Sequence, residues 1–315
     1  MPPVLAAPLF VISLVVTLVA ARLFARRLDR LGVRFGFPEA LIGLLTAVAA
    51  DGPEISSALT ALIKGAHDVG VGVLVGSNGF NLAAMIGLSA LVTGAVRLPR
   101  EVLLLEGTTG LLITVVAGAL LLGWLSPGVA TGGTALVVIP YVMLVLTGAR
   151  RAPGPHEPPA PDAMPSPTHH LLALIILDAA LIVCGSIGMV QTALTLAGHW
   201  HISHAILGVL ILGPLTSIPN AATAVRLGMA DRGAALVGET FNSNTINLGA
   251  GVVVPSLFVT LAAISTLGKL QLAWLLAATL VTLSLLARTG GMRRAGAVSL
   301  ILMYFAFVVG TLVGS

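Results

Sequence analysis

Charge is scarce in this sequence. Only 9% of the 315 residues are Asp, Glu, Lys or Arg, whereas 57% are hydrophobic, and the mean hydropathy is +1.05. A soluble domain carries roughly 25% charged residues, so this chain could not cover a surface that faces water. The composition therefore excludes an ordinary soluble protein and predicts an integral membrane protein whose surroundings are the lipid bilayer.

Cysteine and histidine are scarce where a metal site would need them. The single Cys184 excludes an internal disulfide and a cysteine-based metal cluster. Zinc and copper favour thiolate and imidazole ligands, and all seven histidines fall in expected loops or at segment ends: His67, His156, His169, His170, His199, His201 and His204. We therefore expect neither a soft-metal site nor a bound cofactor.

Long apolar runs dominate what is present. About 20 apolar residues cross a bilayer as a helix, and this rule predicts ten spanning segments. They lie near residues 4–21, 37–63, 69–95, 102–123, 129–148, 170–190, 203–225, 233–262, 268–287 and 296–314. Basic residues follow the first run rather than precede it, so we expect a retained helix and not a secretory signal.

A proline-rich linker separates the first five segments from the last five. It covers residues 149–169 and holds seven prolines between Pro153 and Pro167. Proline at this density favours an extended, unpacked connection. The predicted organisation is a first half over residues 1–148, a cytoplasmic linker over 149–169 and a second half over 170–315.

The basic residues predict the orientation of these segments. Cytoplasmic loops of membrane proteins carry an excess of Lys and Arg. With the N-terminus outside, one side receives Arg22, Arg26, Arg27, Arg30, Arg34, Arg97, Arg100, Arg150, Arg151, Arg226, Arg232, Arg288, Arg293 and Arg294, and the other receives Lys64 and Lys269. We therefore predict a multi-pass protein of the cell (inner) membrane with both termini outside. The net positive charge then reflects topology, and nucleic acid is not an expected partner.

The two halves share a motif. An offset of 166 residues superposes Pro53 on Pro219 and places the Ser-Asn-x-x-Asn stretch 77–81 on 243–247, although the run 43–53 is one residue shorter than 208–219. Because each half has five segments, a repeated second half must be inverted, as in many secondary transporters. The predicted fold class is an all-α integral membrane protein of ten transmembrane helices in two inverted five-helix repeats.

Polar residues inside these apolar segments predict an ion site. An acid at the centre of a spanning helix costs about 2.5–3.5 kcal/mol, and a proline frees backbone carbonyls that can line a cavity. The pattern predicts a proline break in each half, followed by the Ser-Asn-x-x-Asn helix. The candidate ligands all offer oxygen: Asp51, Glu54, Ser77, Asn78, Asn81, Thr216, Ser217, Asn220, Ser243, Asn244 and Asn247. Hard cations such as calcium take about 6–8 oxygens. Helix packing by small polar residues is the alternative explanation, and it accounts poorly for two acids.

These motifs resemble the membrane domain of the sodium/calcium exchanger family, within the cation/calcium antiporter superfamily. Gly76 to Asn81 resembles its Gly-Ser-Asn-x-x-Asn helix, Pro53-Glu54 resembles the end of its first break, and Thr216 to Pro219 resembles the matching stretch of its second repeat. The resemblance implies countertransport of calcium against sodium and no enzymatic activity. It also implies ligands from both repeats: Glu54, Ser77, Asn81, Thr216, Ser217 and Ser243.

The sequence departs from that family at the acids. Asn220 stands where the family has a second Glu, Asn247 where many members have Asp, and Asp51 replaces part of a Thr-Ser pair. If Asp51 faces the site, two carboxylates can neutralise one divalent ion. If it does not, Glu54 stands alone, and a monovalent ion or a proton is the better cargo.

Several alternatives remain open at this point. The antiporter could move other cations or be coupled to protons, and the missing second Glu also fits a homologue that binds ions without moving them. An intramembrane aspartyl protease would need two facing aspartates. Asp178, midway along an apolar segment, is either a packing acid or a protonatable group coupled to transport, and Glu239 is either a ligand or a solvated charge. The oligomeric state is not predicted.

Overall fold

The computed structural model describes residues 2–37, 39–149 and 168–314, so nearly all of the predicted linker 149–169 lies outside the described residues. The chain is almost entirely helical. In order, the elements are α1 (Pro3–Arg34), α2 (Glu39–Ala50), α3 (Gly52–Ile63), α4 (His67–Asn81), η1 (Leu82–Leu88), α5 (Ser89–Thr93), β1 (Ala95–Arg97), α6 (Arg100–Leu121), α7 (Pro127–Ala149), α8 (Thr168–Trp200), α9 (His204–Ile206), η2 (Leu207–Leu212), α10 (Gly213–Met229), α11 (Gly233–Leu248), η3 (Gly249–Val253), η4 (Pro255–Leu257), α12 (Thr266–Thr289), β2 (Gly291–Arg293) and α13 (Arg294–Val313).

Each predicted segment is helical, but they are not equally suited to lipid. Among the described residues, eight helical stretches are long and apolar enough to cross a bilayer. The two predicted segments outside this group are α2–α3 and α11 with its following turns. These two carry Asp51, Glu54, Ser243 and Asn247, and the interruption at Asp51 leaves α2 and α3 with 12 residues each, too short for either to cross a bilayer alone.

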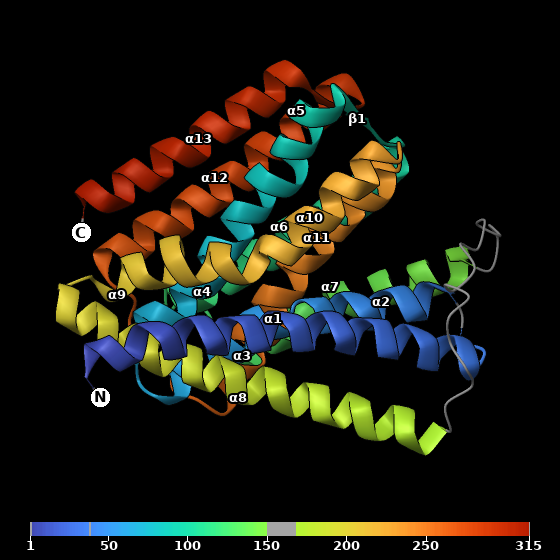
Figure 1. Ribbon diagram of the computed structural model, residues 1–315. Helices are drawn as coiled ribbons and strands as arrows, with labels where there is room; N and C mark the ends of the chain where they lie inside the picture. Colours follow the sequence, from blue (N-terminus) through green and yellow to red (C-terminus); the bar gives the residue numbers. More distant parts are fainter. Residues whose placement is uncertain (1, 38, 150–167, 315) are drawn as a thin grey trace.

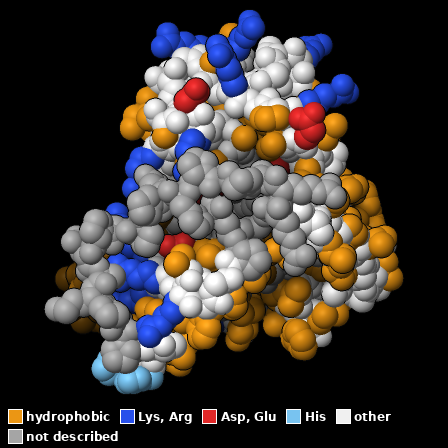
Figure 2. Space-filling model, turned by 90° about the vertical axis from the view of Figure 1, so that its right-hand side faces the viewer, with side chains coloured by type: hydrophobic (Ala, Val, Ile, Leu, Met, Phe, Trp, Pro, Cys, Tyr) orange, Lys and Arg blue, Asp and Glu red, His pale blue; other side chains and the backbone are white. Residues whose placement is uncertain are grey.

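The helices run roughly along one direction, with both termini at the same end (Figure 1). At the opposite end, β1 and β2 pair antiparallel, with Val96 opposite Met292. Lys and Arg side chains gather on the face that includes this end, which Figure 2 views directly. The separation of the termini from the basic face is the arrangement that the arginine pattern predicts.

Helices α1 and α8 pack side by side along one flank of the molecule (Figure 1). An ion pair ties them: Arg27 Nη1 of α1 lies 2.5 Å from Asp178 Oδ2 of α8, and Asp178 is buried. Helix α1 extends well past the predicted residue 21, which carries Arg27 to this position. The packing interpretation of Asp178 is the one this contact favours.

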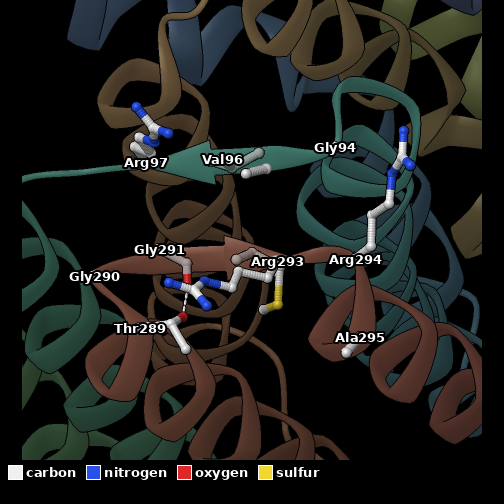
Figure 3. A pocket seen from close by; sticks show the side chains of 11 residues that line it. Gly94, Val96, Arg97, Thr289, Gly290, Gly291, Arg293, Arg294 and Ala295 are labelled. Atoms are coloured by element: carbon white, nitrogen blue, oxygen red, sulfur yellow. Dashed lines mark hydrogen bonds between the residues drawn. The ribbon is translucent and has the colours of Figure 1, made fainter.

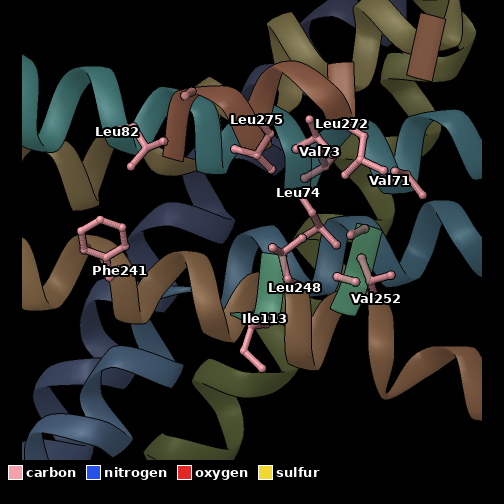
Figure 4. Packing of buried hydrophobic residues seen from close by; sticks show 14 of the residues in the cluster. Val71, Val73, Leu74, Leu82, Ile113, Phe241, Leu248, Val252, Leu272 and Leu275 are labelled. Atoms are coloured by element: carbon pink, nitrogen blue, oxygen red, sulfur yellow. The ribbon is translucent and has the colours of Figure 1, made fainter. Parts of the chain in front are cut away.

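Helix α4 crosses η2 at backbone contact distance. A Cβ at Gly76 would lie 2.2 Å from the carbonyl oxygen of Val209, and a Cβ at Gly213 would lie 2.7 Å from the amide nitrogen of Ser77. Only glycine fits at these two positions, and the close approach sets the Ser77 helix directly against α10. Buried apolar side chains such as Leu74, Phe241 and Leu248 belong to one hydrophobic cluster (Figure 4).

The predicted proline break is present in the first half and wrong for the second. The chain leaves helical order at Asp51, between α2 and α3, whereas α10 continues through Pro219 without interruption. The π-helical turn η2 (Leu207–Leu212) precedes it. A π turn accommodates one extra residue in a helix. The second half has one residue more in the run 208–219 than the first half has in the matching run 43–53. The extra residue is therefore absorbed as η2 rather than as a break.

Candidate functional site

The Ser-Asn-x-x-Asn stretches of α4 and α11 face each other in the centre of the protein. Asn78 Nδ2 donates to the backbone oxygen of Asn244 at 3.1 Å, and Asn244 Nδ2 donates to the backbone oxygen of Asn78 at 3.2 Å. The two residues are 166 positions apart, which is the offset of the sequence repeat. The repeated motif therefore pairs with its own second copy.

The asparagines at the end of each motif use only their N–H groups in this pairing. Asn81 Nδ2 donates to Ser243 Oγ and to Asn244 Oδ1, both at 3.1 Å. Asn247 Nδ2 donates to Ser77 Oγ at 3.3 Å and to Asn78 Oδ1 at 3.0 Å. Both asparagines are fully buried, and the side-chain oxygens of Asn81 and Asn247 receive no hydrogen bond from any described residue.

Asp51 faces this same centre, which resolves the question left open by the sequence. Its Oδ1 accepts hydrogen bonds from Asn220 Nδ2 at 2.9 Å and from Ser243 Oγ at 2.6 Å. It is 1% exposed. Asp51 lies at the junction of α2 and α3, and its side chain contacts both α10 and α11.

Glu54 enters the centre from the first turn of α3. The side chain is 0% exposed, and its Oε1 accepts a hydrogen bond from Ser217 Oγ of α10 at 2.9 Å. The N-terminus of a helix carries partial positive charge, so the position favours a carboxylate. Ser217 and Asn220, two of the three residues of α10 predicted as ligands, thus each donate to one of the two acids.

Two carboxylates lie in this centre, and no Lys or Arg of the described ranges forms an ion pair with them. Neither Asp51 nor Glu54 has a Lys or Arg partner within the described part of the chain, and they repel each other. Buried charges persist when they are paired or bind a metal. The described residues contain no group of three His, Cys, Asp or Glu that could hold a metal, so a site here must combine two carboxylates with amides and hydroxyls.

Four buried oxygens of this centre have no hydrogen-bond donor among the described residues: Asp51 Oδ2, Glu54 Oε2, Asn81 Oδ1 and Asn247 Oδ1. Two are carboxylate and two are amide oxygens, and they come from both halves of the chain. A buried acceptor without a partner costs about 1–3 kcal/mol. Their chemistry is that of ligands for a hard cation, which would satisfy several such oxygens at once.

Two predicted residues take less part in this network. The Thr216 hydroxyl lies 3.0 Å from the carbonyl oxygens of Leu212 and Gly213 in its own helix, so its hydrogen is used locally. Glu239 is half-buried on α11, one turn before Ser243, and interacts electrostatically with Asp51 and with Arg226. Glu239 therefore lies beside the site rather than in its hydrogen-bond network.

Sequence reasoning missed a second polar cluster, made by Glu106 of α6, Tyr141 of α7 and Asn242 of α11. Tyr141 Oη lies 3.0 Å from Glu106 Oε2 and 2.6 Å from Asn242 Oδ1. A signal existed for Glu106, which is an acid within the apolar segment 102–123. Nothing in the spacing along the chain connects it to Tyr141.

A cavity of about 550 Å³ lies at the basic end, around β1 and β2 (Figure 3). Its lining includes Arg97, Arg293 and Arg294 and no acid. A cation would be repelled there. The oxygen-lined centre between α4 and α11 is therefore the candidate site, and it is separate from this cavity.

Known proteins match this chain in sequence. The family described as "Sodium/calcium exchanger protein" matches residues 5–148 and 170–313. A relative named "Putative antiporter CaxA", from Alkalimonas amylolytica, is 27% identical, with 96% of this chain and 97% of the relative covered. "Inner membrane protein YrbG" from Escherichia coli (strain K12) is 27% identical over 80% of each chain.

Solved structures match the fold. The sodium-calcium exchanger NCX_Mj superposes with a TM-score of 0.65 at 19% identity, covering 98% of this chain and 99% of that one. The structure of native YfkE superposes with a TM-score of 0.69 at 18% identity, covering 98% and 92%. The family match spans both halves and both copies of the Ser-Asn-x-x-Asn motif, and the chain belongs to the sodium/calcium exchanger family of membrane antiporters.

Proposed function

We propose that this cation antiporter exchanges calcium for sodium by alternating access, with its binding site between α4 and α11. The observation that carries the proposal is the set of four buried acceptor oxygens defined above, two of them from Asp51 and Glu54. A divalent ion neutralises both carboxylates, whereas one sodium ion leaves a net negative charge in the protein interior. The family and the relative named as an antiporter support exchange as the mode of transport.

The proposed ligands follow from the contacts. Asp51 and Glu54 supply the charge, and Asn81 and Asn247 supply carbonyl oxygens. The remaining residues of the predicted set position these groups or offer hydroxyl and amide oxygens: Ser77, Asn78, Thr216, Ser217, Asn220 and Ser243. Calcium and sodium would compete for overlapping ligands, so one ion must leave before the other binds.

Movement of the α1–α8 pair would alternate access to this site. Binding of one divalent or two monovalent cations removes the net charge between the helices, and a neutral site is less costly to slide past an apolar surface. Because Arg27 and Asp178 tie α1 to α8, we expect the two helices to move as one unit.

Calcium uptake into proteoliposomes tests the proposed exchange. We expect sodium-loaded vesicles to accumulate calcium when they are diluted into sodium-free buffer. Uptake driven only by an imposed proton gradient would instead support a proton-coupled antiporter. Calcium binding without flux under either gradient would support a homologue that binds ions and does not transport them.

We also propose that α2–α3 and α11 with η3 cross the membrane. The chain would then have ten crossings in two inverted five-helix repeats, both termini outside and the basic end in the cytoplasm of the cell (inner) membrane. The two ends of the molecule in Figures 1 and 2 support this topology.

Thiol labelling in intact cells tests the topology. In a Cys184→Ser background, we expect Lys64→Cys, between α3 and α4, to react with a membrane-impermeant reagent. Arg232→Cys, between α10 and α11, should react only after permeabilisation. Protection of the Lys64→Cys variant in intact cells would refute the crossing of α2–α3.

A further inference from the structure

The cluster of Glu106, Tyr141 and Asn242 lies apart from the cation ligands. Tyr141 is 6% exposed, and Glu106 and Asn242 are half-buried. A Cβ on Gly238 would lie 3.8 Å from the carboxyl carbon of Glu106, so this carboxyl group lies directly against α11. Gly238 and Asn242 share a face of α11, whereas Asn247 lies roughly 140° around the helix from Asn242 at 100° per residue.

With the Asn242 amide oriented so that Oδ1 faces Tyr141, the hydrogen bonds of this cluster need one more hydrogen than Tyr141 supplies. Its hydroxyl lies at hydrogen-bond distance from two acceptor oxygens, Glu106 Oε2 at 3.0 Å and Asn242 Oδ1 at 2.6 Å. A phenol has one hydrogen to donate, and an ionised carboxylate and an amide oxygen have none. A proton on Glu106 satisfies all three groups: Glu106 Oε2–H donates to Tyr141 Oη, and Tyr141 Oη–H donates to Asn242 Oδ1.

Among the described residues, no Lys or Arg side chain pairs with Glu106 in place of that proton. Of the elements packed against α6, α7 presents Tyr141 to Glu106 and α11 presents Asn242, while α12 presents the apolar Leu283 at the neighbouring Gly107. Glu239 lies farther round α11, where it interacts with Asp51 and Arg226. In the described part of the chain, Tyr141 is the side chain that forms a hydrogen bond with Glu106.

We propose that Glu106, held by Tyr141 and Asn242, is a proton-binding site separate from the calcium and sodium ligands, and that it holds a proton in this conformation. On ionisation the proton passes to water, and the carboxylate accepts the Tyr141 hydrogen in its place. Asn242 Oδ1 then loses its donor. This proton transfer needs no reactant other than water.

The site acts on cation binding through α11, which carries Asn242 one residue before Ser243. An ionised Glu106 adds a negative charge beside the helix that holds Ser243 and Asn247, and negative charge increases the attraction for cations nearby. Deprotonation at high pH therefore strengthens calcium binding, and protonation at low pH weakens it. This part of the inference rests on the proposed function, whereas the proton site itself does not.

Infrared spectroscopy of the purified full-length protein tests the proton site without transport. The wild-type minus Glu106→Gln spectrum at neutral pH is expected to contain the carbonyl band of a protonated carboxylic acid, lost at alkaline pH. The band should shift in Tyr141→Phe, because its hydrogen-bond acceptor is gone. The control Glu101→Gln removes an exposed acid of the same helix and should remove only carboxylate bands. Carboxylate bands alone in the Glu106 difference spectrum would overturn the proposal.

Calcium titrations at two pH values test the electrostatic effect. Wild type is expected to bind calcium about threefold to tenfold more tightly than Glu106→Gln at alkaline pH, and equally at a pH where the acid band is present. Equal affinities at both pH values would refute the influence on the cation site. If wild type binds no calcium at either pH, the proposed function fails while the infrared result still decides the proton site.

Discussion

Replacement of Glu54 by glutamine is expected to reduce calcium exchange by roughly 100-fold or more. Glutamine is nearly isosteric, and its Oε1 can still accept the hydrogen bond from Ser217. The change removes one of the two negative charges and places an N–H group where Glu54 Oε2 lacks a donor. Calcium flux into proteoliposomes, compared at equal protein content, measures the effect.

The matched control is Glu101→Gln, which removes the same charge from an exposed position at the start of α6. Its exchange rate should equal that of wild type. Calcium exchange retained in Glu54→Gln within threefold of wild type would show that the carboxylate of Glu54 is not a ligand. Unchanged thermal stability of the variant would separate loss of a ligand from loss of the fold.

Removal of the Asp51 carboxylate is expected to weaken calcium binding, and a new carboxylate at position 220 is expected to restore it. Asp51→Asn leaves Glu54 as the sole charge, so calcium affinity should fall by about 100-fold while sodium binding persists. In the double variant Asp51→Asn with Asn220→Asp, the charge moves to the other end of a 2.9 Å hydrogen bond. Because the amide can then donate to the new carboxylate, we expect recovery of at least tenfold of the lost affinity.

Calorimetric titration of calcium and of sodium into the purified variants provides this measurement. Asn220→Asp alone adds a third charge and serves as the reference for the double variant. Wild-type calcium affinity in Asp51→Asn would show that Glu54 alone suffices and that Asp51 has a structural role. Failure of the double variant to recover, with its fold intact, would show that the position of the charge matters as well as its presence.

The sequence predicted the pairing of the halves better than the details of the site. The offset of 166 residues reappears as the reciprocal contact of Asn78 and Asn244, because a motif repeated in sequence can meet itself in space. The direction of Asp51 could not be predicted, since it depends on a one-residue break whose geometry α10 and α11 help to set. The sequence also suggested a break at Pro219, where a π turn absorbs the extra residue instead.

The cluster around Glu106 shows a different limit. Glu106 and Tyr141 are 35 residues apart, and Tyr141 and Asn242 are 101 apart. These separations follow no helical or repeat period, so only the packing of α6, α7 and α11 brings the three groups together. An isolated acid in an apolar segment was the sole signal, and it identified neither partner.

The reciprocal hydrogen bonds between Asn78 and Asn244 resemble a contact at a two-fold axis, where each residue donates one hydrogen bond to the other and accepts one from it. An interface of that kind is self-complementary, so two identical copies of one half could form it. A change at either asparagine would disturb both halves of the contact, which restrains each copy. Asp51 and Asn220 also meet across the halves, but they are not equivalent positions. They can therefore differ without disturbing the reciprocal contact, and the charge is distributed unequally between the two halves.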